Sequence, residues 1–139
     1  MTTKCTIVKV DQVKVLDRGQ GIRTVPLITH VSADNPAFTT GISTYPKGQG
    51  APLHAHNVPE QVTLLEGVGE VEIDGVVTPL KQYDSTYIPG NVTHAFRNTG
   101  EQPMKILWVY ASSHVTRTFA DGRTVEHLSA EDLMGIGNG

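Results

Sequence analysis

Cysteine is nearly absent from this sequence: Cys5 stands alone among 139 residues, so no disulfide can form within the chain. Basic residues are not in excess, with 11 Lys and Arg against 14 Asp and Glu, which argues against nucleic-acid binding. No apolar run approaches the roughly 20 residues of a transmembrane helix. Residues 1–10 also lack an apolar stretch of signal-peptide length. We therefore expect a cytoplasmic protein with neither nucleic-acid nor membrane partners.

Helical periodicity is scarce, and short runs that alternate apolar with polar residues take its place. These runs are rich in Val, Ile, Thr and Tyr, which is typical of strands. The clearest predicted strands cover residues 23–31, 37–45, 60–66, 68–74 and 104–112. The one predicted helix is Ser129–Met134, which Ser129 would cap and Gly135 would end, with a frayed tail over 135–139.

Glycine and proline punctuate the chain, with 14 and 8 residues respectively. Asp74-Gly75 lies between two strand-like runs and predicts a two-residue hairpin, and a second hairpin is predicted around Asp121-Gly122. The spacing predicts roughly nine to eleven strands, which is typical of an all-β sandwich or barrel.

Two histidines are separated by a single residue. Side chains at i and i+2 of a strand point to the same face, so His54 and His56 would project together from Cα atoms about 7 Å apart. Glu60 opens the next predicted strand after a short turn, and its carboxylate can swing back to the same point. His94 begins a strand much later in the chain, and a closed sheet would bring it to the same place.

These residues sit in two motifs that resemble those of the cupin superfamily. Residues 48–67 (GQGAPLHAHNVPEQVTLLEG) resemble the first motif, and residues 83–98 (YDSTYIPGNVTHAFRN) resemble the second. The positions that match the motifs are Gly48, His54, His56, Glu60 and Gly67 in the first and Pro89, His94 and Asn98 in the second.

The resemblance implies a small single-domain metal cupin of the conserved-barrel (cupin 2) type. Its fold would be all-β, a double-stranded β-helix (jelly-roll) barrel with at most one short C-terminal helix. The domain would cover 1–139, with the barrel core at about 35–112. N-terminal strands in 5–31 and C-terminal strands plus the helix in 113–134 would pack outside it. Related single-domain cupins are commonly dimers, so a homodimer is expected, with the strand predicted over 5–17 helping to cover an edge.

Two positions depart from the second motif. Tyr83 replaces the usual first glycine, which suggests that the turn there does not need a positive φ or has been rebuilt. Asn91 replaces a turn glycine and is among the few residues that tolerate a left-handed backbone. Neither position is a candidate ligand.

The motif residues predict one divalent metal ion per chain, held by His54, His56, Glu60 and His94. Three imidazoles and a carboxylate leave open positions on a six-coordinate ion. This donor set is compatible with Fe, Mn, Ni, Cu or Zn.

Further residues are predicted to surround the ion by strand parity. Phe96 and Asn98 share a face with His94: Phe96 would wall the pocket, and Asn98 would either orient a ligand or close the turn at 99–100. We expect strand 37–45 to lie beside the His54–His56 strand. One parity of strand 37–45 must face the cavity, either Gly41, Ser43 and Tyr45 or Thr40, Ile42 and Thr44, and we favour the first set. Tyr45 is then a candidate proton donor, or alternatively an interfacial aromatic whose hydroxyl reaches water.

The remaining aromatic and basic residues have a simpler interpretation. Trp108 and Tyr110 share a face and are expected to pack in the core or in a dimer interface. Arg97 is out of phase with His94 and should face away from the metal. The histidines without motif support, His30, His114 and His127, are expected to be surface or packing residues.

The predicted site favours an enzyme that acts on a small oxygenated or carboxylated organic substrate. Dioxygenase-type oxidative cleavage ranks first, because an open metal site suits chelation together with dioxygen. The alternatives are redox-neutral lyase, decarboxylase or isomerase chemistry, a binding module that does not turn its ligand over, and a structural barrel with a vestigial site. Glu60 is a candidate catalytic base as well as a ligand.

Overall fold

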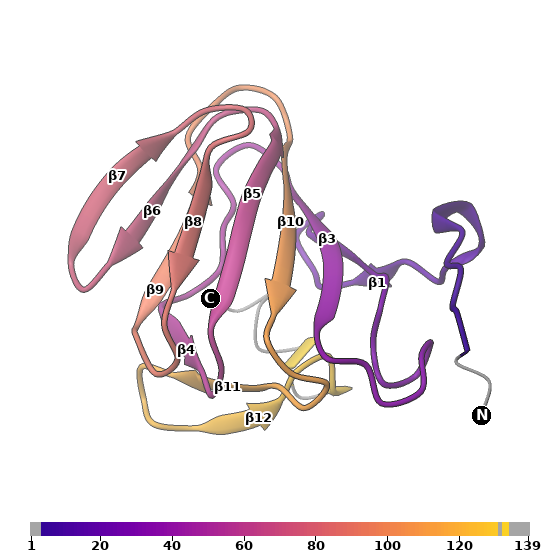
Figure 1. Ribbon diagram of the computed structural model, residues 1–139. Coiled ribbons are helices and arrows are strands. Elements are labelled where there is room, and N and C mark those ends of the chain that lie inside the picture. Colours follow the sequence, from indigo (N-terminus) through magenta and orange to yellow (C-terminus); the bar gives the residue numbers. More distant parts are fainter. Residues whose placement is uncertain (1–3, 131, 134–139) are drawn as a thin grey trace.

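The computed structural model describes residues 4–130 and 132–133, and nearly all of its regular structure is β (Figure 1). A 3-10 turn, Val10–Gln12, precedes the first strand. In chain order the strands are β1 (Leu16–Asp17), β2 (Arg23–Pro26), β3 (Thr39–Tyr45), β4 (His54–His56), β5 (Glu60–Glu66), β6 (Gly69–Ile73), β7 (Val76–Leu80), β8 (Ser85–Ile88), β9 (His94–Asn98), β10 (Met104–Tyr110), β11 (Thr116–Phe119) and β12 (Thr124–Glu126).

These strands form two antiparallel sheets of six strands each. One sheet has the order β1-β2-β3-β10-β5-β8, and the other has the order β12-β11-β4-β9-β6-β7. From β3 to β11 the chain passes repeatedly from one sheet to the other, which is the path of a jelly roll (Figure 1). The predicted all-β jelly-roll barrel is confirmed.

The core fills the space between the sheets. Along β3, β5 and β10 every second side chain is buried, as alternation predicts. Leu64, Ile88 and Met104 are each 1% exposed, and full burial of one such side chain stabilises the fold by about 1.5–3 kcal/mol. The same inward face continues toward the histidines.

Both predicted hairpins are present. Asp74 and Gly75 join β6 to β7 with φ values of 50° and 81°, the left-handed pair that a two-residue type I′ turn requires. Gly122, with φ 89°, lies in the turn between β11 and β12.

Two predicted strands are wrong in extent. The strand predicted over 23–31 ends at Pro26, because Thr29 and Ser32 form a turn in which the Thr29 N–H donates to the Ser32 hydroxyl at 2.9 Å. Over 5–17 only Leu16–Asp17 is a strand. Ile7 and Val10 are largely exposed and have no buried face to occupy.

The expected neighbour of strand 37–45 is also wrong. β3 lies between β2 and β10, whereas β4 lies between β11 and β9 in the facing sheet. Residues 46–53 carry the chain across the barrel rather than back along the same sheet. The inward parity still holds, with Gly41, Ser43 and Tyr45 buried.

The Tyr83 turn keeps its positive φ, contrary to one of the two readings of that position. Tyr83 has φ 72° and Asn91 has φ 65°. A left-handed non-glycine residue costs about 1–2 kcal/mol. The Tyr83 N–H donates to Leu64 O at 2.7 Å, and the side chain is exposed, so the turn is held by its backbone.

The chain turns helical after Ser129. Residues 130, 132 and 133 are helical, and the Ser129 hydroxyl accepts a hydrogen bond from the Asp132 N–H at 3.3 Å, as expected of a cap. Residues 131 and 134 and the predicted tail 135–139 lie outside the described residues. Within the part of the chain that the structure describes, no helix is long and apolar enough to cross a membrane.

Candidate metal centre

Three histidines converge inside the barrel. His54 and His56 come from β4, and His94 opens the adjacent β9 directly opposite His54. Their candidate ligand nitrogens all lie within 4.8 Å of one another. All three side chains are buried, with exposures of 4%, 3% and 1%. The structure thus assembles a group that could hold a metal ion.

Glu60 reaches the same point from the opposite sheet, at the start of β5. Its Oε1 atom is 3.0 Å from His94 Nε2 and 3.8 Å from His56 Nε2. The four predicted ligand residues are therefore brought together, with three from one sheet and one from the other.

Backbone carbonyls orient the three imidazoles. His54 Nδ1 lies 2.6 Å from Pro52 O, His56 Nδ1 lies 3.0 Å from Thr116 O, and His94 Nδ1 lies 2.8 Å from Val92 O. A carbonyl oxygen only accepts, so each Nδ1 carries the proton. In the neutral ring, each Nε2 is then left with a lone pair that faces the interior.

This tautomer makes the contact between His94 and Glu60 a contact between two acceptors. A neutral His94 Nε2 and an ionised carboxylate oxygen at 3.0 Å repel each other unless a proton or a cation lies between them. A divalent ion on these donors satisfies both at once. The residues therefore fit the metal that the motif implies.

Burial and neighbouring charge favour the ligand-ready states. Burial lowers the pKa of His56 to about 3, against the opposing effect of Glu60. Burial, followed by the positive charge of Arg117, lowers the pKa of His54 well below its usual value. Burial alone would raise the pKa of Glu60, but its close contacts with His94 and His56 outweigh that effect and lower the pKa. At neutral pH, His54 and His56 are thus neutral and Glu60 is ionised.

Tyr45, Ser43 and Phe96 line a cavity of about 20 Å³ beside His54 and Glu60. Burial raises the pKa of Tyr45, so its hydroxyl keeps its proton. Asn98 does not line the cavity: it donates to Tyr45 O and Gln102 O at 2.9 Å each and accepts from the Gly100 N–H at 2.8 Å. These bonds close the turn and hold the backbone behind Tyr45.

Trp108 and Tyr110 have polar partners in the site that the sequence interpretation did not include. The Trp108 indole N–H donates to the Ser43 hydroxyl at 2.9 Å, and the Tyr110 hydroxyl lies 3.2 Å from His56 Nε2. Burial, followed by the charge of Glu60, raises the pKa of Tyr110 well above its usual value. From the sequence, alternation along the strand predicted only that Trp108 and Tyr110 share one face. The contacts depend on the pairing of β10 with β3 and β5.

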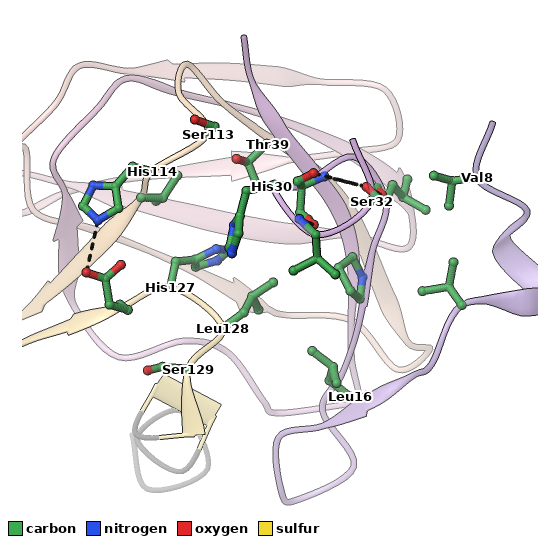
Figure 2. Close-up of a pocket in the computed structure, with 17 residues that line it drawn as sticks. Val8, Leu16, His30, Ser32, Thr39, Ser113, His114, His127, Leu128 and Ser129 are labelled. Carbon is green, nitrogen blue, oxygen red and sulfur yellow. Dashed lines mark hydrogen bonds and ion pairs between the residues drawn. The ribbon is translucent and has the colours of Figure 1, made fainter. Parts of the chain in front are cut away.

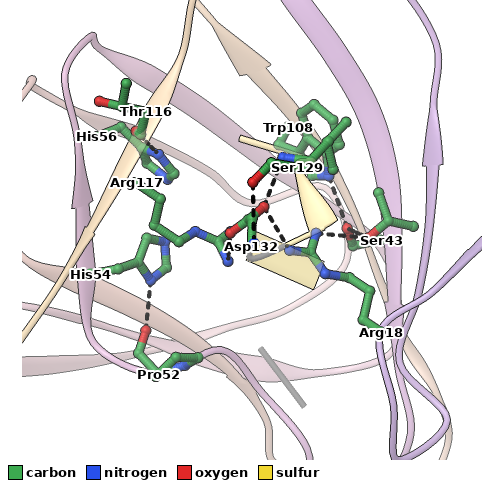
Figure 3. Close-up of polar contacts among 12 residues, drawn as sticks. Arg18, Ser43, Pro52, His54, His56, Trp108, Thr116, Arg117, Ser129 and Asp132 are labelled. Atoms are coloured by element: carbon green, nitrogen blue, oxygen red, sulfur yellow. Dashed lines mark hydrogen bonds and ion pairs between the residues drawn. The ribbon is translucent and has the colours of Figure 1, made fainter. Parts of the chain in front are cut away.

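Sequence reasoning also missed a buried charged cluster next to the histidines. Arg18 and Arg117 line the same cavity, and Figure 3 shows Asp132 between their guanidinium groups. Arg117 lies directly opposite His56 in the β11–β4 pair, so it points inward with that histidine. Nothing in the sequence marked Arg117, because that pairing joins strands about 60 residues apart.

The other histidines and Arg97 do not join the three ligands. His127 is partly buried and packs against Trp108 and Tyr110, with ring centroids 5.1 and 4.8 Å away. His114 is exposed and lies beside Glu126. Arg97 faces outward and pairs with Glu70 and Glu72, as its phase predicted.

Comparison with protein families identifies the architecture. The family model for the cupin domain matches residues 41–110, which is half of the chain. The chain belongs to the cupin family. The matched region runs from β3 through β10 and contains all four candidate ligands of this cupin. Cupins typically bind metal, and here the three histidines could hold it.

Named relatives of this cupin differ in activity. Polyketide synthase CurC of Streptomyces cyaneus is 30% identical over 92 residues, which are 66% of this chain and 58% of the relative. The 5-nitrosalicylic acid 1,2-dioxygenase of a Bradyrhizobium species is 31% identical over 67 residues, 48% of this chain and 32% of the relative. This cupin thus spans less than two thirds of the length of either relative.

Solved structures show the same fold. The polyketide cyclase RemF of Streptomyces resistomycificus aligns with a TM-score of 0.68 over 94% of this cupin and 90% of that chain. Sequence identity is 18%, so the likeness establishes the architecture alone.

Proposed function

We propose that this cupin is a metal-dependent enzyme that acts on a small organic molecule, with dioxygenase-type oxidative cleavage as its reaction. The observation that carries the proposal is the convergence of three Nε2 lone pairs and the Glu60 carboxylate on one buried point. Three histidines and one carboxylate leave coordination positions open for substrate and oxygen. The relative that is named as a dioxygenase gives separate support.

In this proposal His54, His56, His94 and Glu60 hold the ion. When bound, a redox-active ion supplies dioxygen activation and polarises a substrate oxygen. Phe96, Ile106 and Trp108 wall the cavity and exclude bulk water.

The tyrosines favour a second candidate, redox-neutral lyase, decarboxylase or isomerase chemistry. Tyr45 and Tyr110 place two protonated hydroxyls in the site, because burial raises both pKa values. Glu60 is the candidate base for such a reaction, and Tyr45 is the candidate proton donor.

Oxygen uptake distinguishes these reactions. Metal-free protein is loaded separately with Fe, Mn, Ni, Cu or Zn and offered diketones, catechols and phenolic acids. We expect oxygen consumption to match substrate loss with a redox-active metal and to stop with zinc. Turnover without oxygen, including with zinc, would instead establish the redox-neutral reaction. A ligand recovered unchanged after long incubation with every metal would identify a binding module.

Tyr45→Phe tests the proton-donor role. The ring stays in place and only the hydroxyl is lost, so we expect normal metal content and a fall in kcat of about 10²- to 10⁴-fold. Tyr87→Phe is the matched control, because Tyr87 is 68% exposed on β8 and should leave kcat unchanged. Steady-state kinetics on the loaded enzyme measure both variants. An unchanged kcat in Tyr45→Phe would show that Tyr45 lines the cavity without donating a proton.

A further inference from the structure

Three charged side chains from distant parts of the chain meet inside the barrel. Arg18 follows β1, Arg117 lies on β11 and Asp132 belongs to the C-terminal segment. They are 3%, 4% and 0% exposed, respectively. Buried charges of this kind are costly unless each is paired and hydrogen-bonded.

The pairing among them is incomplete. Arg18 Nη2 donates to Asp132 Oδ2 at 2.9 Å, and Arg18 Nη1 donates to Thr24 Oγ1 at 3.3 Å. Arg117 Nη1 lies 3.1 Å from Asp132 Oδ1 as an ion pair, but the angles do not make a hydrogen bond. Within the described residues, Arg18 Nε, Arg117 Nε, Arg117 Nη1 and Asp132 Oδ1 have no hydrogen-bond partner.

The cluster has more positive than negative charge. Two guanidinium groups share one carboxylate, and the nearby Glu60 carboxylate is already in contact with His94. Both arginines line the cavity that contains His54 and Tyr45. A second anion is therefore favoured at this point, next to the candidate metal ligands. Because Asp132 already binds both arginines, the geometry accepts a carboxylate.

The cavity itself has room for little more than one water molecule, at about 20 Å³. A groove of about 770 Å³ lies on the other side of His127, which lines both spaces (Figure 2). Leu128 and Ser129 also line this groove, and Asp132 follows them in the chain. The wall between groove and cavity is thus part of the segment that carries Asp132.

Resting on the proposed function, we infer that the substrate is a small organic acid whose carboxylate replaces Asp132 on Arg117 and Arg18. Residues 127–130 move aside together with Asp132, and the acid enters from the groove. Asp132 then acts as an internal substitute that closes the site when no acid is bound.

Binding of benzoate and of its neutral isostere benzamide to the metal-loaded protein tests this inference. The sequence contains a single tryptophan, so the fluorescence of Trp108 in the cavity wall reports occupancy, and calorimetry gives Kd. We expect benzoate to bind at least about tenfold more tightly than benzamide, since a charged hydrogen-bonded contact is worth about one to two powers of ten in Kd. Arg117→Gln should weaken benzoate by about 10- to 100-fold and leave benzamide unchanged.

Arg97→Gln is the matched control, because Arg97 pairs with Glu70 and Glu72 on the outer face and should not affect either ligand. Asp132→Asn removes the competing carboxylate and should tighten benzoate binding. If that variant does not fold, chymotrypsin digestion of the wild-type protein replaces it: benzoate, but not benzamide, should speed cleavage at Leu128.

Equal Kd values for benzoate and benzamide, both unaffected by Arg117→Gln, would overturn the inference. Benzoate binding that leaves cleavage at Leu128 unchanged would overturn the movement of the segment. Neither result alters the metal content or oxygen uptake, which test the proposed function separately.

Discussion

His54→Ala and His94→Ala each yield a folded protein that no longer retains a metal ion. Each variant removes one of three imidazoles whose Nε2 atoms converge, and two imidazoles do not compensate for the third. Loss of a group that merely orients a metal ligand costs about 10- to 100-fold in affinity, so loss of a ligand should exceed about 100-fold. Elemental analysis and calorimetric titration with the metal measure the change.

His114→Ala provides the control for the loss of a histidine. His114 is exposed beside Glu126 and is not a candidate metal ligand, so this variant should bind metal like the wild type. Circular dichroism verifies that all three variants keep their β structure. Wild-type metal content and affinity in His94→Ala would show that the histidine cluster is not the metal centre.

Gly41→Ala is expected to lower the free energy of unfolding by about 2–4 kcal/mol, the sum of overpacking and a weakened hydrogen bond. A Cβ atom at this position would lie 2.2 Å from Trp108 Cζ2 and 2.3 Å from Cη2. The indole cannot simply turn away, because its N–H is bonded to the Ser43 hydroxyl and its edge is buried. Urea denaturation followed by circular dichroism measures the loss.

The same substitution in a Trp108→Leu background isolates the cause. Leucine lacks the indole atoms that the new Cβ would meet, so Gly41→Ala should cost less than about 1 kcal/mol there. An equal cost in both backgrounds would assign the effect to the backbone of β3 rather than to the ring.

The parts of this molecule that the sequence predicted are those set by local periodicity. Because side chains alternate along a strand, the sequence alone predicts that His54 and His56 share one face and that Ser43 and Tyr45 share another. The Asp74-Gly75 hairpin likewise depends only on adjacent residues. The short turn after His56 allowed Glu60 to be placed beside this pair, whereas His94 joined them only through the expected closed sheet and the motif resemblance.

What the sequence could not predict depends on pairing between distant segments. The placement of β3 and β4 in facing sheets is known only once the path of the chain between the sheets is known. The inward direction of Arg117 is known only from its pairing with His56. Asp132 gave no signal either, because an acidic residue after a helix cap is ordinarily a solvated one. Tyr83 shows the converse: its left-handed backbone is imposed by the turn, although its residue type disfavours it.

The contact between Arg18 and Asp132 also constrains the order of folding, since 114 residues separate the two partners. During synthesis from the N-terminus, Arg18 is made 114 residues before Asp132, its counter-charge. Until then its guanidinium remains in water, because burying it alone would cost several kcal/mol. Closure of this end of the barrel therefore belongs to the last stage of folding, and contacts of such long sequence separation make that stage slow.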